Sequence, residues 1–306
     1  MSVTKPRNLV PHLWFDNQAR EAADFYCSVF PDAGIRYATS LRNTPSGDCE
    51  VVSFALAGQP FIAISAGPLF KFNPSVSFFV NFDPSRDSRV CDHLDALWAA
   101  LSDGGQVLMP LQEYPFSKRY GWVQDRYGLS WQLILSNPEG APRPMIIPSL
   151  LFTGSVCGKA EEAGTFYRSV FPGSLAGQLV RYPAGMEPNR EGTVMFSDFR
   201  LGDTWIAAMD SALGHGFGFN EAISLLVQCD AQDEIDHYWA NLSSDPEAEQ
   251  CGWCKDRYGL SWQVGPRLME EILASGDQAK IDRVTQVFLK MKKVDIPALE
   301  RAFNQA

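Results

Sequence analysis

The chain has 306 residues, 45% hydrophobic and 20% charged, which is the length of two ordinary domains and the composition of a folded globular protein. Its net charge of −10 argues against a nucleic-acid-binding protein, and no apolar run reaches the roughly 18–20 residues that span a bilayer. Because the seven cysteines are odd in number and irregularly spaced, they do not form a disulfide framework, and we expect a cytoplasmic protein.

The first half of the chain reads as a mixture of strands and helices. Apolar residues at spacings of three and four predict an amphipathic helix over residues 19–30, ended by Pro31. A second stripe of this kind predicts a helix over residues 90–101, closed by a pair of glycines. The expected strands cover residues 11–15, 50–58, 60–65 and 75–82, a hairpin within 103–124, and 129–135.

The second half repeats the first. The octapeptide DRYGLSWQ occurs at residues 125–132 and again at residues 256–263, and other matched segments keep the same order in both halves. PHLWF answers to PSLLF, and FYCSVFP answers to FYRSVFP. Each repeat reads as β-α-β-β-β followed by α-β-β, an α+β layout. The expected divisions are a first domain over 1–137, a linker over 138–145, a second domain over 146–266 and a helical extension over 267–306.

The two repeats are unequal. Between the second helix and the octapeptide, the second repeat is ten residues shorter, so we expect it to lack much of the hairpin. In the extension, Ile281, Val284 and Phe288 share one helical face. A last helix begins after Asp295, a residue type that favours the N-cap position.

Several of these segments carry a family resemblance. PHLWFDNQAREAADFYCSVFP, the GG and MPL of the hairpin, and DRYGLSWQL are similar to the PhnB-like branch of the vicinal oxygen chelate (glyoxalase/bleomycin-resistance/dioxygenase) superfamily. Many members of this branch bear the label 3-demethylubiquinone-9 3-methyltransferase-like. The resemblance implies tandem glyoxalase-like domains, built from βαβββ modules whose curved, mixed, mostly antiparallel sheets close around a cavity, plus a C-terminal helical tail.

The resemblance also implies where a divalent metal would bind. Relatives that use a metal place one ligand at the start of the first strand, which falls on Pro11 in this chain, and a Glu in the last strand. Gln132 and Gln263 stand at the positions of that Glu. His12, next to Pro11, is expected to point to the opposite face of the strand. Because dications prefer carboxylates, we expect no metal and no other cofactor; a metal held through His12, Gln132 or Glu113 is the alternative.

The candidate ligand-binding residues are aromatic and polar side chains of the strands and of the hairpin. For each one, packing in a core is the competing interpretation, and no residue is assigned a catalytic role. The segment CGWC (251–254) lacks the setting of a redox or zinc motif, because it precedes a strand and has no second CxxC. The candidates are His12, Trp14, Glu113, Tyr114, Lys118, Trp122, Tyr127, Trp131, Gln132 and Gln263.

The sequence therefore predicts a small-molecule-binding protein without the usual metal site. The first repeat is expected to bind the ligand, and the second to act as a permanent pseudo-dimer partner, with a further homodimer left open. One alternative is a lyase, isomerase or dioxygenase, with or without a metal, that acts on a small polar or aromatic substrate. Another is a methyltransferase linked to ubiquinone synthesis. Neither a nucleic acid nor a membrane is expected as a partner.

Overall fold

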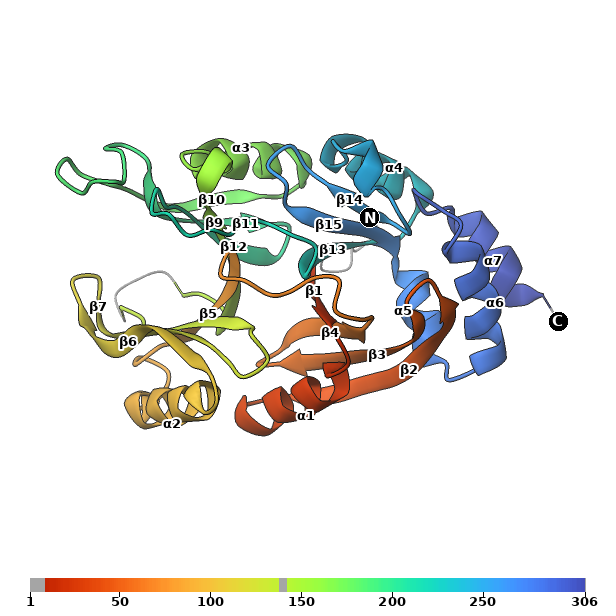
Figure 1. Cartoon of the computed structure of the whole chain (residues 1–306), viewed down its shortest axis with the longest axis horizontal. Coiled ribbons are helices and arrows are strands. Elements are labelled where there is room, and N and C mark those ends of the chain that lie inside the picture. Colours follow the sequence, from red (N-terminus) through yellow and green to blue (C-terminus); the bar gives the residue numbers. More distant parts are fainter. Residues whose placement is uncertain (1–8, 138–141, 306) are drawn as a thin grey trace. The chain divides into compact units, whose positions relative to one another are not determined.

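The computed structural model describes residues 9–137 and 142–305, so residues 138–141 of the expected linker lie outside the described part. The chain divides into two compact units. Unit 1 comprises Met1–Lys71 and Asn220–Ala306, and unit 2 comprises Phe72–Phe219. Each unit is built on one β-sheet with helices packed against it (Figure 1).

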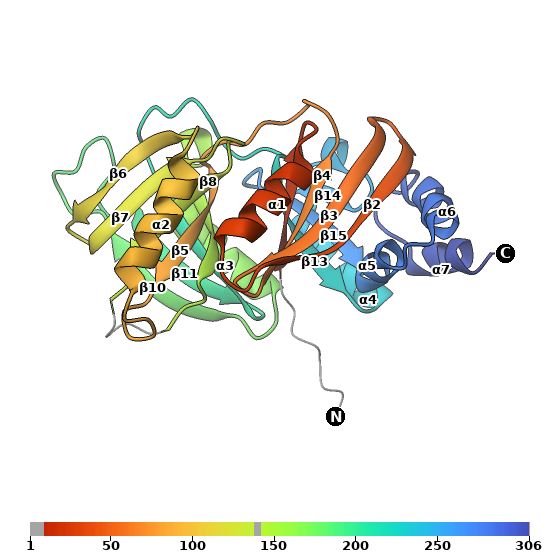
Figure 2. The ribbon, with the colours of Figure 1, turned by 90° about the horizontal axis from the view of Figure 1, so that it is seen from below.

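Unit 1 contains a seven-stranded sheet in the order β14-β15-β13-β1-β4-β3-β2. Helix α1 packs against β3 and β4, and Figure 2 shows it beside these strands. Helix α4 packs in the same way against β15 and β13. The elements are β1 (Leu9–Phe15), α1 (Ala19–Val29), β2 (Gly34–Thr44), β3 (Gly47–Leu56), β4 (Gln59–Ser65), β13 (Ile223–Cys229), α4 (Gln232–Leu242), β14 (Trp253–Lys255) and β15 (Ser261–Pro266).

Unit 2 contains an eight-stranded sheet in the order β10-β11-β12-β9-β5-β8-β7-β6. Helix α2 packs against β7 and β8 and helix α3 against β11 and β12. The elements are β5 (Val76–Phe82), α2 (Val90–Ser102), β6 (Gln106–Tyr114), β7 (Ser117–Gln124), β8 (Ser130–Leu135), β9 (Ile146–Phe152), α3 (Ala160–Val170), β10 (Leu175–Arg181), β11 (Val194–Leu201) and β12 (Thr204–Asp210).

Each unit takes one module from each repeat. In unit 1, β1 of the first repeat pairs antiparallel with β13 of the second, and His12 lies opposite Ser224. In unit 2, β5 of the first repeat pairs antiparallel with β9 of the second, and Ser77 lies opposite Ser149. The segments 1–137 and 146–266 therefore describe the repeats along the chain, whereas each compact unit combines the first module of one repeat with the second module of the other.

The predicted α+β layout is confirmed, with one strand per repeat that residue patterns did not reveal. That strand is β2 in the first repeat and β10 in the second. Every residue of β2 is half-buried or exposed, and every residue of β10 is exposed. Because strand patterns depend on one buried face, these edge strands carry no alternation of apolar and polar residues.

The repeated octapeptide encodes a turn that is held by one aspartate. In unit 2, Asp125 Oδ1 accepts hydrogen bonds from the backbone amides of Tyr127 (2.9 Å) and Leu129 (3.0 Å), and its Oδ2 accepts one from Trp131 Nε1 (2.9 Å). Asp256 accepts the same three bonds in unit 1, at 2.8, 3.1 and 2.9 Å. Both carboxylates are buried, so the Asp and the Trp must be kept together for the turn to form.

The C-terminal extension completes unit 1. Helices α5 (Arg267–Ala274) and α6 (Gln278–Phe288) pack on β2 beside the sheet, and α7 (Ile296–Asn304) packs on α6 (Figure 1). After α6, the chain pairs with the segment before β14: the amide of Cys251 donates to the Met291 carbonyl at 2.8 Å, and that of Gly252 to the Lys292 carbonyl at 2.7 Å. This stretch makes the contacts that the shortened hairpin of the second repeat does not supply.

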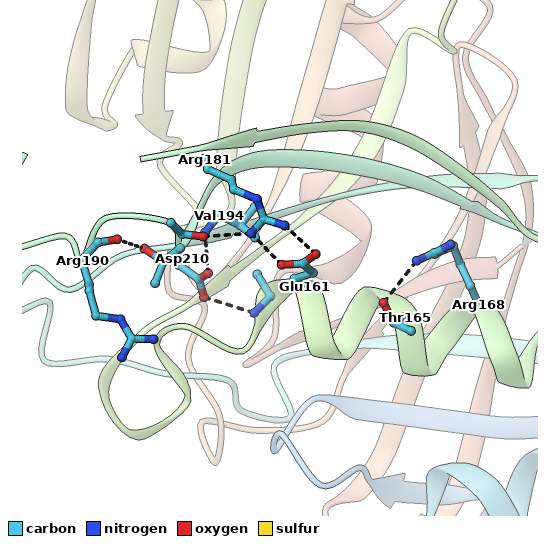
Figure 3. Close-up of polar contacts among 10 residues, drawn as sticks. Glu161, Thr165, Arg168, Arg181, Arg190, Val194 and Asp210 are labelled. Atoms are coloured by element: carbon cyan, nitrogen blue, oxygen red, sulfur yellow. Dashed lines mark hydrogen bonds and ion pairs between the residues drawn. The ribbon is translucent and has the colours of Figure 1, made fainter. Parts of the chain in front are cut away.

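The turn between β9 and α3, which is longer than the corresponding turn between β1 and α1, is organised by Asp210. Its Oδ1 accepts hydrogen bonds from the amides of Gly158 (2.7 Å) and Ala160 (3.1 Å), and its Oδ2 accepts one from Val194 (2.9 Å). Figure 3 shows this carboxylate at the start of α3, beside the ion pair between Arg181 and Glu161. The added residues form a turn that the aspartate ties to α3 and β11.

We expect the Asp210→Ser variant, which introduces the residue type that the first repeat has at this position, to lose about 2 kcal/mol of unfolding free energy. A serine oxygen cannot accept all three amide hydrogen bonds, and amides left buried without a partner are costly. Urea denaturation monitored by tryptophan fluorescence measures the loss. The matched control is Ser65→Ala in unit 1, where the hydroxyl accepts only the Ala19 amide (3.1 Å) and we expect a loss of about 1 kcal/mol. Equal losses in the two variants would contradict this account.

Candidate functional site

A cavity of about 500 Å³ lies within unit 1. Its walls come from the seven-stranded sheet, from the hairpin between β2 and β3, and from helices α5 and α6. Most lining side chains are apolar. Both repeats and the C-terminal extension contribute, so the cavity is not a property of the first repeat alone. The apolar lining includes Trp14, Val51, Ile62, Leu226, Met269 and Phe288.

His12 lies at the wall of this cavity. It is only 8% exposed, and its Nδ1 has no hydrogen-bond partner among the described residues. Its ring meets that of Trp253 edge to face, with 5.5 Å between the centroids. Burial lowers the pKa of His12 from 6.5 to about 4, so the imidazole is neutral at pH 7. His12, a candidate ligand-binding residue from the sequence, therefore lies at the cavity.

Gln263 supplies the amide of the site from β15. Its Nε2 donates to Ser224 Oγ at 2.9 Å, which leaves Oε1 as the free end of the side chain. In the described chain no donor contacts Oε1. Trp253 lies directly opposite on β14, and its Nε1 likewise has no acceptor among the described residues. The buried Ser261 hydroxyl is also unpaired.

These five residues form what we call the polar cluster: His12, Ser224, Trp253, Ser261 and Gln263. Four of them line the cavity, and Ser224 holds the amide of Gln263 in place.

Unit 2 has the same residue types as four members of the polar cluster, and these side chains are hydrogen-bonded. Gln132 Nε2 donates to Ser77 Oγ at 2.8 Å, and Gln132 Oε1 accepts from the Tyr120 hydroxyl at 2.7 Å. Trp122 Nε1 donates to Ser130 Oγ at 2.7 Å. Trp122 and Ser130, the counterparts of Trp253 and Ser261, thus bond to each other in unit 2, whereas Gln132 bonds to Tyr120, which stands where unit 1 has Cys251. Ser149 stands in place of His12, and its hydroxyl has no partner among the described residues.

The two units also differ in the size of the side chains beside this network. Where unit 1 has Leu226 and Val51, the corresponding residues of unit 2 are Phe79 and Phe196, whose rings meet edge to face at 5.9 Å. Phe79 belongs to an apolar cluster that also contains Tyr120. Nearby, the Arg143 guanidinium lies 3.7 Å from the Trp205 ring centroid and pairs with Asp198 at 2.7 Å. Larger rings therefore fill in unit 2 the positions that border the cavity in unit 1.

The charged groups at the cavity wall are mostly carboxylates. Lys255, the one lysine among the described lining residues, pairs with Glu221 at 2.7 Å. Glu270, from α5, accepts a hydrogen bond from Gln228 Nε2 at 2.7 Å. Burial raises the pKa of Tyr37, and the negative charge of Glu270 adds to this effect. Among the described lining residues, none therefore offers an unpaired cation to a ligand.

The structure divides the ten predicted site residues between the units. His12, Trp14 and Gln263 lie together at the unit 1 cavity, where the Trp14 indole donates to the Gly67 carbonyl at 2.8 Å. Trp131 is fully buried and serves the Asp125 turn. The remaining candidates belong to unit 2: Glu113 and Lys118 are exposed, Tyr114, Trp122 and Tyr127 are half-buried, and Gln132 is buried.

Sequence reasoning missed Ser224, Ser261 and Trp253. The signal for two of them was present, because Ser261 lies in the second copy of the octapeptide and Trp253 corresponds to the candidate Trp122. The lining residues of α5 and α6 had no counterpart in either repeat, so nothing in the repeat pattern could assign them to the site.

The side chains on the four central strands of unit 1 fit a divalent ion poorly. Along β1, β4, β13 and β15 they are His12, Ile62, Ser224 and Gln263, which offer one imidazole, one hydroxyl and one amide but no carboxylate. Over the described residues, no group of three His, Cys, Asp or Glu side chains is placed to hold a metal. A hard or borderline dication prefers a carboxylate at such a site.

The cysteines of CGWC are placed unfavourably for redox chemistry. Both Cys251 and Cys254 are buried, and neither forms a disulfide. Burial raises the pKa of both thiols, that of Cys254 to about 12, where Asp256 and Glu249 add to the effect. Because the thiolate is the reactive form, neither side chain is activated as a nucleophile.

In the described part of the chain, no helix has the length and apolar character required to cross a membrane.

Comparisons with known proteins agree with the fold. The chain matches no curated protein. Among solved structures, the PhnB protein from Bacillus cereus is 33% identical and covers 42% of this chain and 100% of its own, with a TM-score of 0.38. Glyoxalase I from Zea mays is 11% identical and covers 85% of this chain and 92% of its own, with a TM-score of 0.50, and a variant of it reaches 0.52.

At 11% identity, the likeness to glyoxalase I shows the fold alone. The family model of 3-demethylubiquinone-9 3-methyltransferase matches residues 7–134 and residues 144–265, which is one match in each repeat. The two matched segments cover most of the chain and coincide with the repeats found in the sequence. The chain therefore belongs to the 3-demethylubiquinone-9 3-methyltransferase family, the PhnB-like branch of the vicinal oxygen chelate superfamily, with two repeats in tandem.

Proposed function

We propose that this protein binds a small, mainly apolar molecule in the cavity of unit 1, with the polar cluster holding a polar group of the ligand. A volume of about 500 Å³ lies within the range of small-molecule sites, which are mostly apolar with a few placed polar groups. Unit 2 then serves as the filled, structural counterpart. A cytoplasmic location and a further homodimer stay part of this proposal.

The contrast between the two polar networks carries the proposal. A buried polar group without a partner costs about 1–3 kcal/mol, which is why such groups are rare in folded proteins. In unit 2 the counterparts of Gln263 and Trp253 are satisfied by Tyr120, which stands where unit 1 has Cys251, and by Ser130. In unit 1, His12 Nδ1 is buried without a partner among the described residues, and Gln263 Oε1 and Trp253 Nε1 belong to side chains that line the cavity. A ligand in that cavity would complete their hydrogen bonds.

We further propose that the site works without a divalent ion. The strand positions offer no carboxylate, and Glu270 already accepts a hydrogen bond from Gln228. Thermal unfolding of protein purified without chelator should therefore be unaffected by zinc, nickel or manganese. A stabilisation by one of these ions that is lost in the His12→Gln variant would count against a metal-free site.

Methyl transfer, the activity in the family's name, is not part of this proposal. Glycine-rich turns that approach a cofactor commonly join a strand to a helix. Here residues 103–106 lead from α2 to β6, and residues 214–218 lie between β12 and β13. Neither glycine-rich segment has that setting.

Filling the cavity is expected to abolish binding. Prodan, an uncharged naphthalene dye whose emission depends on polarity, should bind wild-type protein with a blue-shifted emission. The double variant Val51→Phe and Leu226→Phe introduces the residue types of unit 2, which removes space from the cavity. We expect its affinity for prodan to fall at least tenfold, measured by fluorescence titration.

The matched control acts on the other unit. Phe79→Leu and Phe196→Val together remove the corresponding rings from unit 2 and should leave prodan affinity unchanged, although the folded state loses stability because a cavity forms in a packed cluster. If prodan binding survived the filling of unit 1, or if it followed the state of unit 2, the proposed site would be wrong.

A further inference from the structure

The open ends of the polar cluster limit the chemistry of the ligand's polar group. Gln263 donates one of its two Nε2 hydrogens to Ser224, and its carbonyl Oε1, which no donor contacts among the described residues, can only accept. Trp253 Nε1, on the residue directly opposite, can only donate. A head group placed against both must therefore donate one hydrogen bond and accept another. A hydroxyl does both with a single oxygen atom.

Charge at the cavity disfavours an anion. A carboxylate would face the Gln263 carbonyl oxygen and would gain no cation, because His12 is neutral above about pH 4 and Lys255 is paired with Glu221. Removing an ion from water without a partner is far more costly than removing a neutral hydroxyl. The ligand is therefore expected to be uncharged where it meets the cluster.

Aromatic rings border the cavity next to the cluster. The ring centroid of Trp14 lies 5.1 Å from that of Phe70 and 6.2 Å from that of Trp253, and both pairs meet edge to face. Ile62 and Leu226 line the neighbouring strands. These surfaces suit a flat apolar body, because aromatic groups gain both from burial and from ring-to-ring contact.

We infer that unit 1 binds an uncharged, mainly apolar molecule whose head group both donates and accepts a hydrogen bond, as a hydroxyl does. The head group accepts from Trp253 Nε1 and donates to Gln263 Oε1, and the body occupies the apolar part of the cavity. This inference rests on the proposed function and adds the class of ligand to it.

Three naphthalene probes of similar size test the class: 2-naphthol, naphthalene and the 2-naphthoate anion. Displacement of prodan from the full-length protein gives their affinities. We expect 2-naphthol to bind about tenfold more tightly than naphthalene, since the cluster forms hydrogen bonds only with the former. We expect 2-naphthoate to bind more weakly than naphthalene.

Two single variants test whether the polar cluster causes the difference in affinity between 2-naphthol and naphthalene. Trp253→Phe keeps an aromatic ring and removes the N–H, so the affinity for 2-naphthol should fall about fivefold while that for naphthalene stays the same. Gln263→Leu should remove most of the difference between the two probes. The matched control is Trp122→Phe in unit 2, which breaks the bond to Ser130 and should leave all three affinities unchanged.

The outcomes separate this inference from the proposed function. Equal affinities for 2-naphthol and naphthalene, or tightest binding of 2-naphthoate, would overturn the ligand class. Prodan binding that is lost on filling the cavity would then still support the site. An undiminished preference for 2-naphthol in both Trp253→Phe and Gln263→Leu would also overturn the inference, because the head group would then lie elsewhere.

Discussion

Replacing Asp256 by alanine is expected to lower the free energy of unfolding by about 4 kcal/mol, or the melting temperature by roughly 10 °C. The buried carboxylate accepts hydrogen bonds from the amides of Tyr258 and Leu260 and from Trp262 Nε1. Alanine leaves these three donors without that acceptor in the interior. Guanidinium denaturation measures the stability, and fluorescence of the buried tryptophan reports the local change.

The same variant should also weaken binding. Trp262 precedes Gln263 on β15, so a loosened turn displaces the amide of the polar cluster, and we expect prodan affinity to fall. Asp125→Ala removes the equivalent bonds from unit 2 and should cost about as much stability without changing prodan affinity. Asp16→Ala, at an exposed aspartate, is the surface control and should change stability by less than about 0.5 kcal/mol. Asp256→Ala with stability equal to that control would refute this role.

Local sequence patterns predicted most elements because each has one buried face or a distinct turn. The helix expected over 19–30 is α1 over Ala19–Val29, and the strand expected over 75–82 is β5 over Val76–Phe82. The N-cap expected at Asp295 is confirmed, since its side chain accepts from the Ala298 amide at 2.8 Å. The edge strand β2 was missed because α5 and α6, not its own alternation, determine what it buries.

The pairing of modules could not be read from the repeats. The pattern of β1 is compatible with pairing to either of two similar strands, β5 or β13, because both offer an apolar face of the same length. The structure pairs it with β13 of the other repeat. Candidates from one repeat, such as His12 and Gln132, were therefore assigned to one domain although they belong to different units.

The face that His12 presents depends on register, which a short strand does not encode. A shift of one residue reverses every side chain of a strand, and counting from the helix placed Pro11 at the cavity. The pairing of β1 with β13 instead brings His12 opposite Ser224, on the face of Gln263. The cavity exists because the side chains of Val51 and Leu226 are smaller than those of Phe196 and Phe79, which fill the corresponding space in unit 2.

We expect stability to depend on pH through His12. In the folded protein its pKa is about 4 because the ring is buried, whereas the unfolded chain titrates it near 6.5. Between these values, the unfolded state holds a proton that the folded state does not, so acid favours unfolding. The loss of unfolding free energy due to His12 is absent above pH 6.5 and grows as the pH falls, to about 3 kcal/mol near pH 4.

The His12→Gln variant removes this group and should therefore lose less stability on acidification. Unfolding free energies of wild type and variant should run parallel from pH 8 to pH 6.5 and then converge by about 3 kcal/mol down to pH 4, because only the wild type protonates at this position on unfolding. His237→Gln, which replaces an exposed histidine of α4, should keep the wild-type curve. Parallel curves for wild type and His12→Gln down to pH 4 would show that His12 is not held neutral in the folded state.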